Sequence, residues 1–452
     1  MQGILFEYEL NPTTWVYLSS LLIVGIYFKF RRFWSIRNLD LVGLIVFSPG
    51  LLMVYRGLQA ELEPAANVQS GQWLEQIGYI WLFSVGAFFL VRLLLDPVLV
   101  RRPLLEPNLS AGGLTFTGVA LLIFLMSNVL NPKTAEPVEL GRPSHERLEH
   151  VLARQKPPVR EGPGYPPFRA FARASNDALL PAGEGDAEKP RPGLTQAVAS
   201  QAAVIVVHLA LLIGIVLIGY RHFDNIHTGV ATATLYLLLP YTAQMTARVD
   251  HVIPAALLVW TVAVYRKPVV AGVLLALAAG LIYYPLYLLP LWCSFYWRRG
   301  LFRFVAGVIG MLALMALLLL LSPESLGTFG QQLQRMLGLM NPLTAELAGF
   351  WQYHSEVFRI PVLAAFVALC AGLALWPAQK NLGTLLSCSA AVMLGAQFWH
   401  AHQGGIHMAW YLPLLLLTVF RPNLEDRVAV TAVKEGWGRW RKGRPGRVDA
   451  GS

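Results

Sequence analysis

A series of apolar stretches divides the 452-residue chain, and lysine and arginine residues occur almost entirely in every second loop between these stretches. Because loops rich in Lys and Arg stay cytoplasmic, this alternation predicts a multi-pass membrane topology. It predicts an N-terminus outside and a C-terminal tail in the cytoplasm. The cytoplasmic groups are Lys29, Arg31, Arg32 and Arg37; Arg101 and Arg102; Arg221; Arg266 and Lys267; Arg298, Arg299 and Arg303; Lys380; and the tail from Arg421.

The composition agrees with a membrane protein. Hydrophobic residues make up 55% of the chain and charged residues 14%, which is too apolar for a soluble globule. The net charge of +10 needs no nucleic acid, since the basic loops and tail suit anionic membrane lipids. Cys293, Cys370 and Cys388 lie in or beside apolar segments without paired spacing, so neither a disulfide framework nor a cysteine metal site is expected.

The apolar stretches predict an all-α transmembrane bundle of about eleven spans, most of them near the length needed to cross the hydrocarbon. The predicted spans are 13–29, 39–55, 77–98, 112–130, 197–218, 228–244, 252–265, 304–321, 361–376, 382–399 and 406–420. Four regions follow: a four-span part (1–130), a flexible outward loop rich in Pro and Gly (131–196), a larger membrane part (197–420) and a basic cytoplasmic tail (421–452). Both membrane parts are helical.

Residues 268–297 break the alternation, because basic residues flank both ends. Tyr283-Tyr284-Pro285 in the middle should interrupt a helix. We expect a short helical hairpin whose bend is buried in protein or lines a cavity; the alternative is one long, tilted, kinked helix. In the outward loop 322–359, Leu326, Phe329, Leu333, Met336, Leu337 and Met340 recur at helical spacing and predict an interfacial amphipathic helix.

Arg248, Asp250 and His251 lie together at the predicted outer end of a span. One interpretation is structural, with Asp250 as a helix N-cap and Pro254 in the first helical turn. The other is functional, since a carboxylate beside an arginine and a histidine could abstract a proton while a phosphate is held. Both interpretations stay open from the sequence.

The segment around these residues resembles the central stretch of bacterial GT-C-type polyprenyl-phosphate-sugar glycosyltransferases, which are mannosyltransferase-like. The resemblance covers about 50 residues, in three pieces. They are Arg248-Val-Asp-His-Val-Ile-Pro-Ala-Ala-Leu-Leu; Tyr265-Arg-Lys-Pro-Val-Val-Ala-Gly-Val-Leu-Leu-Ala-Leu-Ala-Ala-Gly; and Tyr284-Pro-Leu-Tyr-Leu-Leu-Pro. Leu281-Ile282-Tyr283 stands where such proteins usually carry a lysine.

The resemblance implies a catalytic carboxylate in the first large outward loop, which here holds Glu61, Glu63 and Glu75. The matching pair is Glu61-Leu-Glu63, which could also be a solvated acidic turn before Pro64. In the implied reaction, Glu61, Glu63 or Asp250 accepts the proton of the acceptor hydroxyl. Arg248 or Arg359 stabilises the departing phosphate of a polyprenyl-phosphate-linked sugar. No cofactor is implied.

A second polar group, Trp399-His-Ala-His-Gln-Gly-Gly-Ile-His407, contains His400, His402 and His407. Three histidines could bind a metal, but Gly404-Gly405 indicates a turn, and histidines also suit the head-group level. We therefore expect these histidines, with His251, to line an outward substrate pocket without a metal. His208, alone within a span, is expected to hydrogen-bond a neighbouring helix.

The leading expectation is a glycosyltransferase at the outer face of a bacterial cytoplasmic (inner) membrane. The alternative is a non-enzymatic membrane protein, either a transporter or a subunit of a complex. Few charges are expected within the spans, and no inverted repeat is evident, which both argue against an ion-coupled transporter.

Overall fold

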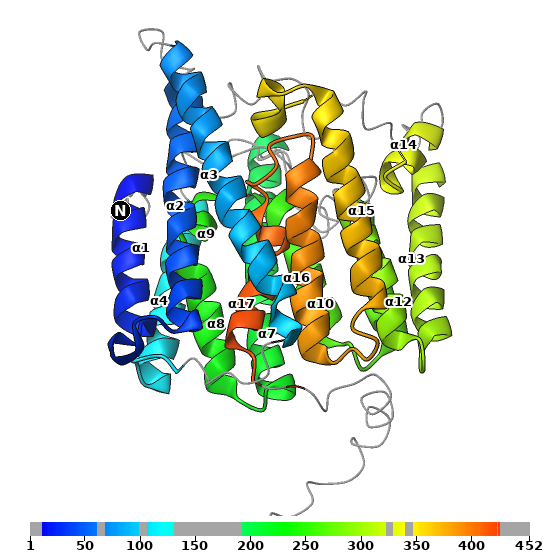
Figure 1. The fold of residues 1–452 in the computed structure, drawn as a ribbon, viewed down its shortest axis with the longest axis horizontal. Coiled ribbons are helices and arrows are strands. Elements are labelled where there is room, and N and C mark those ends of the chain that lie inside the picture. Colours follow the sequence, from blue (N-terminus) through cyan, green and yellow to red (C-terminus); the bar gives the residue numbers. More distant parts are fainter. Residues whose placement is uncertain are drawn as a thin grey trace, which may run out of the picture.

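The protein is an all-helical bundle, as the sequence predicts (Figure 1). The computed structural model describes residues 11–60, 68–98, 106–130, 192–246, 248–321, 329–339, 347–422 and 424. The α-helices in this part are α1 (Pro12–Tyr27), α2 (Ile36–Ala60), α3 (Val68–Leu94), α4 (Ala111–Val129), α7 (Pro192–His222), α8 (Ile226–Leu238), α9 (Pro240–Gln244), α10 (Val249–Ala263), α11 (Pro268–Leu281), α12 (Leu289–Tyr296), α13 (Leu301–Leu321), α14 (Phe329–Met336), α15 (Arg359–Leu375), α16 (Leu382–Trp399) and α17 (Leu412–Phe420).

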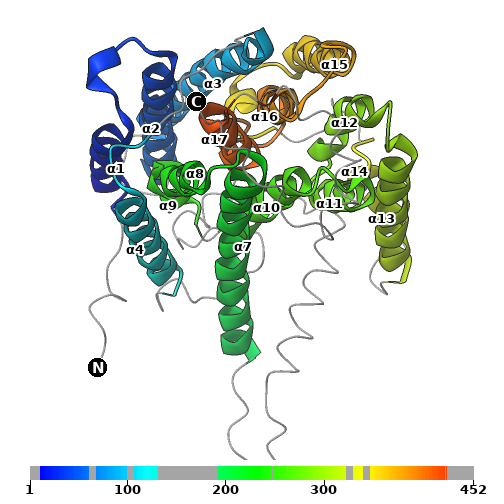
Figure 2. The ribbon, with the colours of Figure 1, turned by 90° about the horizontal axis from the view of Figure 1, so that it is seen from below.

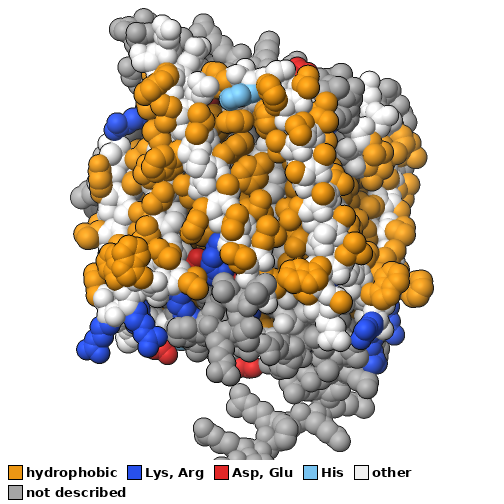
Figure 3. All heavy atoms as spheres, in the orientation of Figure 1, with side chains coloured by type: hydrophobic (Ala, Val, Ile, Leu, Met, Phe, Trp, Pro, Cys, Tyr) orange, Lys and Arg blue, Asp and Glu red, His pale blue; other side chains and the backbone are white. Residues whose placement is uncertain are grey.

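Seven of the described helices are long and apolar enough to cross a membrane. Their apolar stretches are Ile36–Ala60, Gln69–Leu94, Ala111–Val129, Gln201–His222, Leu301–Leu320, Glu356–Leu375 and Leu382–Trp399. Shorter apolar helices cover Pro12–Tyr27, Ile226–Leu238, His251–Ala263 and Pro268–Leu281. Each predicted span before the last overlaps one of these helices, and the hydrophobic side chains on their outer faces cover the middle of the molecule (Figure 3).

The helix ends gather at two opposite ends of the bundle. One is the basic end, where the turns at Lys29–Arg32 and Arg298–Arg303 lie, and Lys and Arg side chains gather at the lower edge of Figure 3. Contacts join the turns there: Asn108 Nδ2 donates to Phe28 O at 3.1 Å, and His222 Nε2 lies 2.7 Å from Ala263 O. Each of these two pairs of turns therefore lies at one end of the bundle, as the charge pattern predicts. The opposite end is called the site end below.

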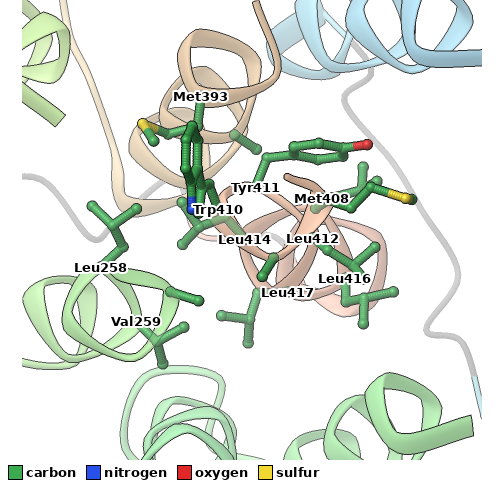
Figure 4. Packing of buried hydrophobic residues seen from close by; sticks show 14 of the residues in the cluster. Leu258, Val259, Met393, Met408, Trp410, Tyr411, Leu412, Leu414, Leu416 and Leu417 are labelled. Carbon is green, nitrogen blue, oxygen red and sulfur yellow. The ribbon is translucent and has the colours of Figure 1, made fainter. Parts of the chain in front are cut away.

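The last two helices occupy the centre of the bundle. Within α16, 94% of the residues are buried, and every residue of α17 is buried. Figure 4 shows Leu414 and Leu417 of α17 beside Leu258 and Val259 of α10. In the view from below, α1 and α13 lie at opposite margins, with α16 and α17 between them (Figure 2).

The hairpin is confirmed at residues 268–297. The chain leaves the basic end along α11 and returns through the 3-10 turn η5 (Tyr284–Leu288) and α12. A Cβ on Gly300 would lie 2.9 Å from Pro268 Cγ, so both ends of the hairpin meet. Tyr284 and Pro285 are buried, as expected for a bend that cannot face lipid.

Two predicted spans are wrong in detail. Residues 228–244 form two helices, because Leu239 is extended and Pro240 starts α9. The span predicted at 406–420 is helical only in α17, while residues 400–411 form a buried segment of turns and one 3-10 turn. That irregular backbone is enclosed by protein, as it must be within a membrane.

Other expectations need correction or lie outside the described residues. The loop predicted at 131–196 ends earlier, because α7 begins at Pro192; residues 131–191 are not described. The predicted amphipathic helix is present as α14, but Leu326 and Met340 lie outside the described residues. The ring of His208 contacts its own helix, with Nδ1 3.0 Å from Val204 O, instead of a neighbour.

A buried chain of charges joins α2, α3 and the start of the tail at the basic end. Arg92 makes a bidentate pair with Asp40, with both N–O distances 2.9 Å, and its Nη1 lies 3.2 Å from Asp96 Oδ1. Arg421 Nε donates to Asp96 Oδ2 at 3.1 Å. Asp40 and Asp96 are 1% and 0% exposed, so these carboxylates depend on the arginines for charge compensation. Arg421, predicted as a tail cation, is part of this buried network.

Candidate functional site

A column of stacked rings forms the centre of the site end. We call it the histidine stack: His251, His407, His400 and Tyr284, in that order. The centroid distances are 4.7 Å between His251 and His407, 4.7 Å between His407 and His400, and 4.9 Å between His400 and Tyr284. Three of the predicted binding residues thus come together from α10 and the segment after α16.

Local structure fixes the first ring. Pro240 starts the short helix α9, which brings Tyr241 beside the first turn of α10. The Tyr241 hydroxyl lies 2.6 Å from His251 Nδ1, and both residues are buried. The break at Leu239 that the sequence reading missed is therefore what positions His251.

The third ring is fixed by the turn that follows α16. The backbone N–H of His402 donates to His400 Nδ1 at 3.0 Å, so the neutral ring carries its proton on Nε2. The turn is tied to the segment after α14, where Ala348 N donates to Ala401 O and Gln403 N donates to Ala348 O, each at 2.9 Å. Gly405 adopts a φ of +94°, which favours glycine, and its N–H donates to Gln397 Oε1 at 3.1 Å.

Two arginines lie at the histidine stack. Arg359, at the start of α15, is 3% exposed, and its Nη2 donates to Trp399 O at 3.1 Å. Arg248 is 8% exposed and forms the N-cap residue of α10. Both act electrostatically on the stack, Arg359 on His400 and Arg248 on His407.

Burial disfavours a charge on the stacked imidazoles, since His400 is 5% exposed and His407 is 2% exposed. The site therefore presents the charges of Arg248 and Arg359 beside uncharged rings.

Several buried polar atoms around the stack have no hydrogen-bond partner among the described residues. They are His407 Nδ1, Trp399 Nε1 and Trp410 Nε1. The Trp410 ring lies 4.4 Å from His407 and 5.3 Å from Tyr284, measured between centroids. Indole N–H groups only donate, so this surrounding suits a ligand that offers acceptor oxygens.

The structure does not describe the side chains of the three predicted catalytic carboxylates. Glu61 and Glu63 lie outside the described residues. Asp250 is the second residue of α10, and its side chain is not described. The interpretation of Asp250 as N-cap is wrong, because Arg248 holds that position, and Pro254 lies inside the helix instead of in its first turn.

The structure buries another carboxylate at this end. Glu75 was read as a loop residue, but α3 begins at Val68 and includes it. Glu75 is 0% exposed and accepts a hydrogen bond from the Tyr353 hydroxyl at 2.9 Å. Tyr241, Tyr284 and Trp410 were also not predicted as site residues. Only Tyr284 had a sequence signal, the Tyr-Pro step that bends the hairpin.

The histidines do not form a metal centre in the described part of the chain. No group of three or more His, Cys, Asp or Glu side chains is placed there to hold a metal ion. His402 stands apart from the stack, with its ring centroid 6.2 Å from that of His400.

Comparisons of the chain with protein-family models, with curated proteins and with solved structures found no match. A functional assignment therefore depends on the chemistry of the site.

Proposed function

We propose that the protein is a membrane-embedded glycosyltransferase that uses a polyprenyl-phosphate-linked sugar at the outer face of a bacterial cytoplasmic membrane. In this proposal the site end faces outward, and the basic end and the tail face the cytoplasm, in accordance with the charge rule. The observation that carries the proposal is the pair of buried arginines at the histidine stack. Such a pair suits an anionic phosphate presented from the bilayer.

The proposed reaction divides the work between the two kinds of side chain. The acceptor hydroxyl loses its proton to Asp250, Glu61 or Glu63, and its oxygen attacks the anomeric carbon of the sugar. The bond between that carbon and the phosphate oxygen breaks, and polyprenyl phosphate leaves. Arg248 and Arg359 stabilise the negative charge that develops on the phosphate. The indole N–H groups of Trp399 and Trp410 are available to donate to its oxygens.

Transfer from radiolabelled polyprenyl-phosphate sugars by the purified, reconstituted protein tests the proposal. Arg248→Gln and Arg359→Gln should each lower kcat/KM by about 100-fold or more, the usual effect of removing one group that stabilises developing charge. Arg56→Gln is the matched control. Arg56 is an exposed arginine of α2 near the same end, where its Nη2 donates to Thr13 Oγ1 at 3.2 Å. Wild-type rates in both site variants, or no transfer by the wild type from any such donor, would reject the proposal.

A further inference from the structure

The turn between α1 and α2 presents large aromatic side chains outward. Trp34 is 81% exposed, Phe30 68% and Phe33 58%. Their rings form a cluster with Phe28, with centroid distances of 5.1 Å from Phe28 to Phe30 and 5.3 Å from Phe28 to Phe33. An exposed aromatic cluster of this kind fits the boundary between hydrocarbon and head groups.

Cationic side chains accompany these rings. Arg31 and Arg32 are exposed within the same turn, and Lys29 precedes them. The group lies at the basic end, below the apolar outer faces of the helices (Figure 3). The turn therefore combines apolar rings with positive charge where a lipid head group would lie.

A buried asparagine holds this turn in one conformation. Asn38 is 1% exposed, and its Nδ2 lies within 3.2 Å of the carbonyl oxygens of Lys29, Arg32 and Phe33. Its Oδ1 accepts from Lys29 N at 3.1 Å. The carbonyl groups of the turn therefore point inward to Asn38. A preordered surface of this kind loses less conformational entropy on binding.

A second asparagine fastens the other side of the turn. Asn108, which precedes α4, donates through Nδ2 to Gly25 O at 3.0 Å and to Phe28 O at 3.1 Å. Its Oδ1 accepts from Lys29 Nζ at 3.0 Å. The turn is thus fixed between α2 and α4, with Arg31 and Arg32 left at the surface.

We propose that this turn is a binding site for the head group of an anionic phospholipid. Arg31 and Arg32 bind the phosphate and the negative charge of the head group, while Phe30, Phe33 and Trp34 pack against the adjoining glycerol and acyl region. The site depends on membrane embedding but not on sugar transfer.

Titration of the purified full-length protein in detergent with short-chain phosphatidylglycerol tests the proposal. Short-chain phosphatidylcholine serves as the uncharged comparison. The wild type should bind phosphatidylglycerol more tightly, and added salt should weaken that preference. Arg31→Gln/Arg32→Gln should weaken phosphatidylglycerol binding by about thirtyfold, from the typical contribution of each arginine near an anionic surface. Phosphatidylcholine binding should stay unchanged.

Arg266→Gln/Lys267→Gln is the matched control, because it removes two positive charges from another turn at the basic end, where the neighbouring Tyr265 is buried. It should retain most of the wild-type preference. Asn38→Asp keeps the size of the side chain but removes its amide donors, so it should also weaken binding; the Arg31→Gln/Arg32→Gln variant remains decisive if this one does not fold. Equal binding of both lipids by the wild type, or equal losses in the Arg31→Gln/Arg32→Gln variant and the control, would overturn the proposal.

Discussion

Of Asp250→Asn and Glu63→Gln, the variant that removes the general base is expected to abolish measurable sugar transfer while the protein still folds and inserts. Each substitution preserves the size of the side chain but removes its ability to accept a proton at neutral pH. Loss of a positioned general base costs about 100- to 10,000-fold in rate. Asp250 is the stronger candidate, since it lies between Arg248 and His251, which the structure places at the histidine stack.

The measurement is single-turnover transfer from a polyprenyl-phosphate sugar, with donor affinity determined separately. A lost base lowers the rate of the chemical step and leaves donor binding largely intact, whereas the arginine variants should weaken both. Glu106→Gln is the control, because Glu106 is an exposed carboxylate at the basic end, away from the site. Full activity in both the Asp250 and the Glu63 variants would show that neither carboxylate is the base.

Arg92→Gln is expected to produce the largest loss of stability. It removes the bidentate partner of Asp40 and a second contact to Asp96, inside a region where both carboxylates are buried. Breaking a buried ion pair by removing one partner typically costs about 3–5 kcal/mol. The double variant Arg92→Gln/Asp40→Asn should recover part of this loss, because it leaves no buried charge at position 40.

Thermal unfolding in detergent, followed by circular dichroism, measures the effect. Arg303→Gln is the matched control, an exposed arginine at the same end of the bundle that should unfold at the wild-type temperature. If Arg92→Gln unfolded with the control, the pairs with Asp40 and Asp96 would contribute nothing net to stability.

The large-scale fold could be predicted because it depends on local signals. Stretches of apolar residues predicted helices, and the basic residues on both sides of 268–297 predicted the hairpin. Pro285 indicated the bend, because proline lacks a backbone N–H and disfavours a helical backbone conformation at the preceding Tyr284. Each of these effects acts over a few residues, so one sequence is enough to reveal it.

The missed features depend on contacts between distant segments. Nothing near Arg421 distinguishes it from the other tail cations, yet Asp96 of another turn binds it. Asn38 looks like an ordinary polar residue beside Arg37, but its amide organises the preceding turn. Pro240 could have indicated the helix break at Leu239–Pro240. The sequence does not show, however, that this break places Tyr241 against His251.

The candidate site likewise combines residues that the sequence indicated with contacts between distant segments that it did not. The sequence selected Arg248, His251, Arg359, His400 and His407 as separate outward residues, and their proximity in the fold brings them to one place. Tyr284 completes the stack and Trp410 packs beside His407, but hydrophobic segments contain many such aromatic rings. The kinetic test with Asp250→Asn and Glu63→Gln distinguishes these two carboxylates as the general base.

The central position of α16 and α17 has a consequence for biogenesis. These helices follow α3, α8 and α10 in the chain, yet they fill the interior that those helices surround. During synthesis the earlier helices enter the bilayer without their central packing partners, so the bundle cannot reach its final arrangement until the ribosome has passed Phe420. With only nine residues, α17 is also too short to cross the hydrocarbon alone. Its insertion therefore depends on helices already in the membrane, and the interior of the bundle is filled only after the surrounding helices have been made.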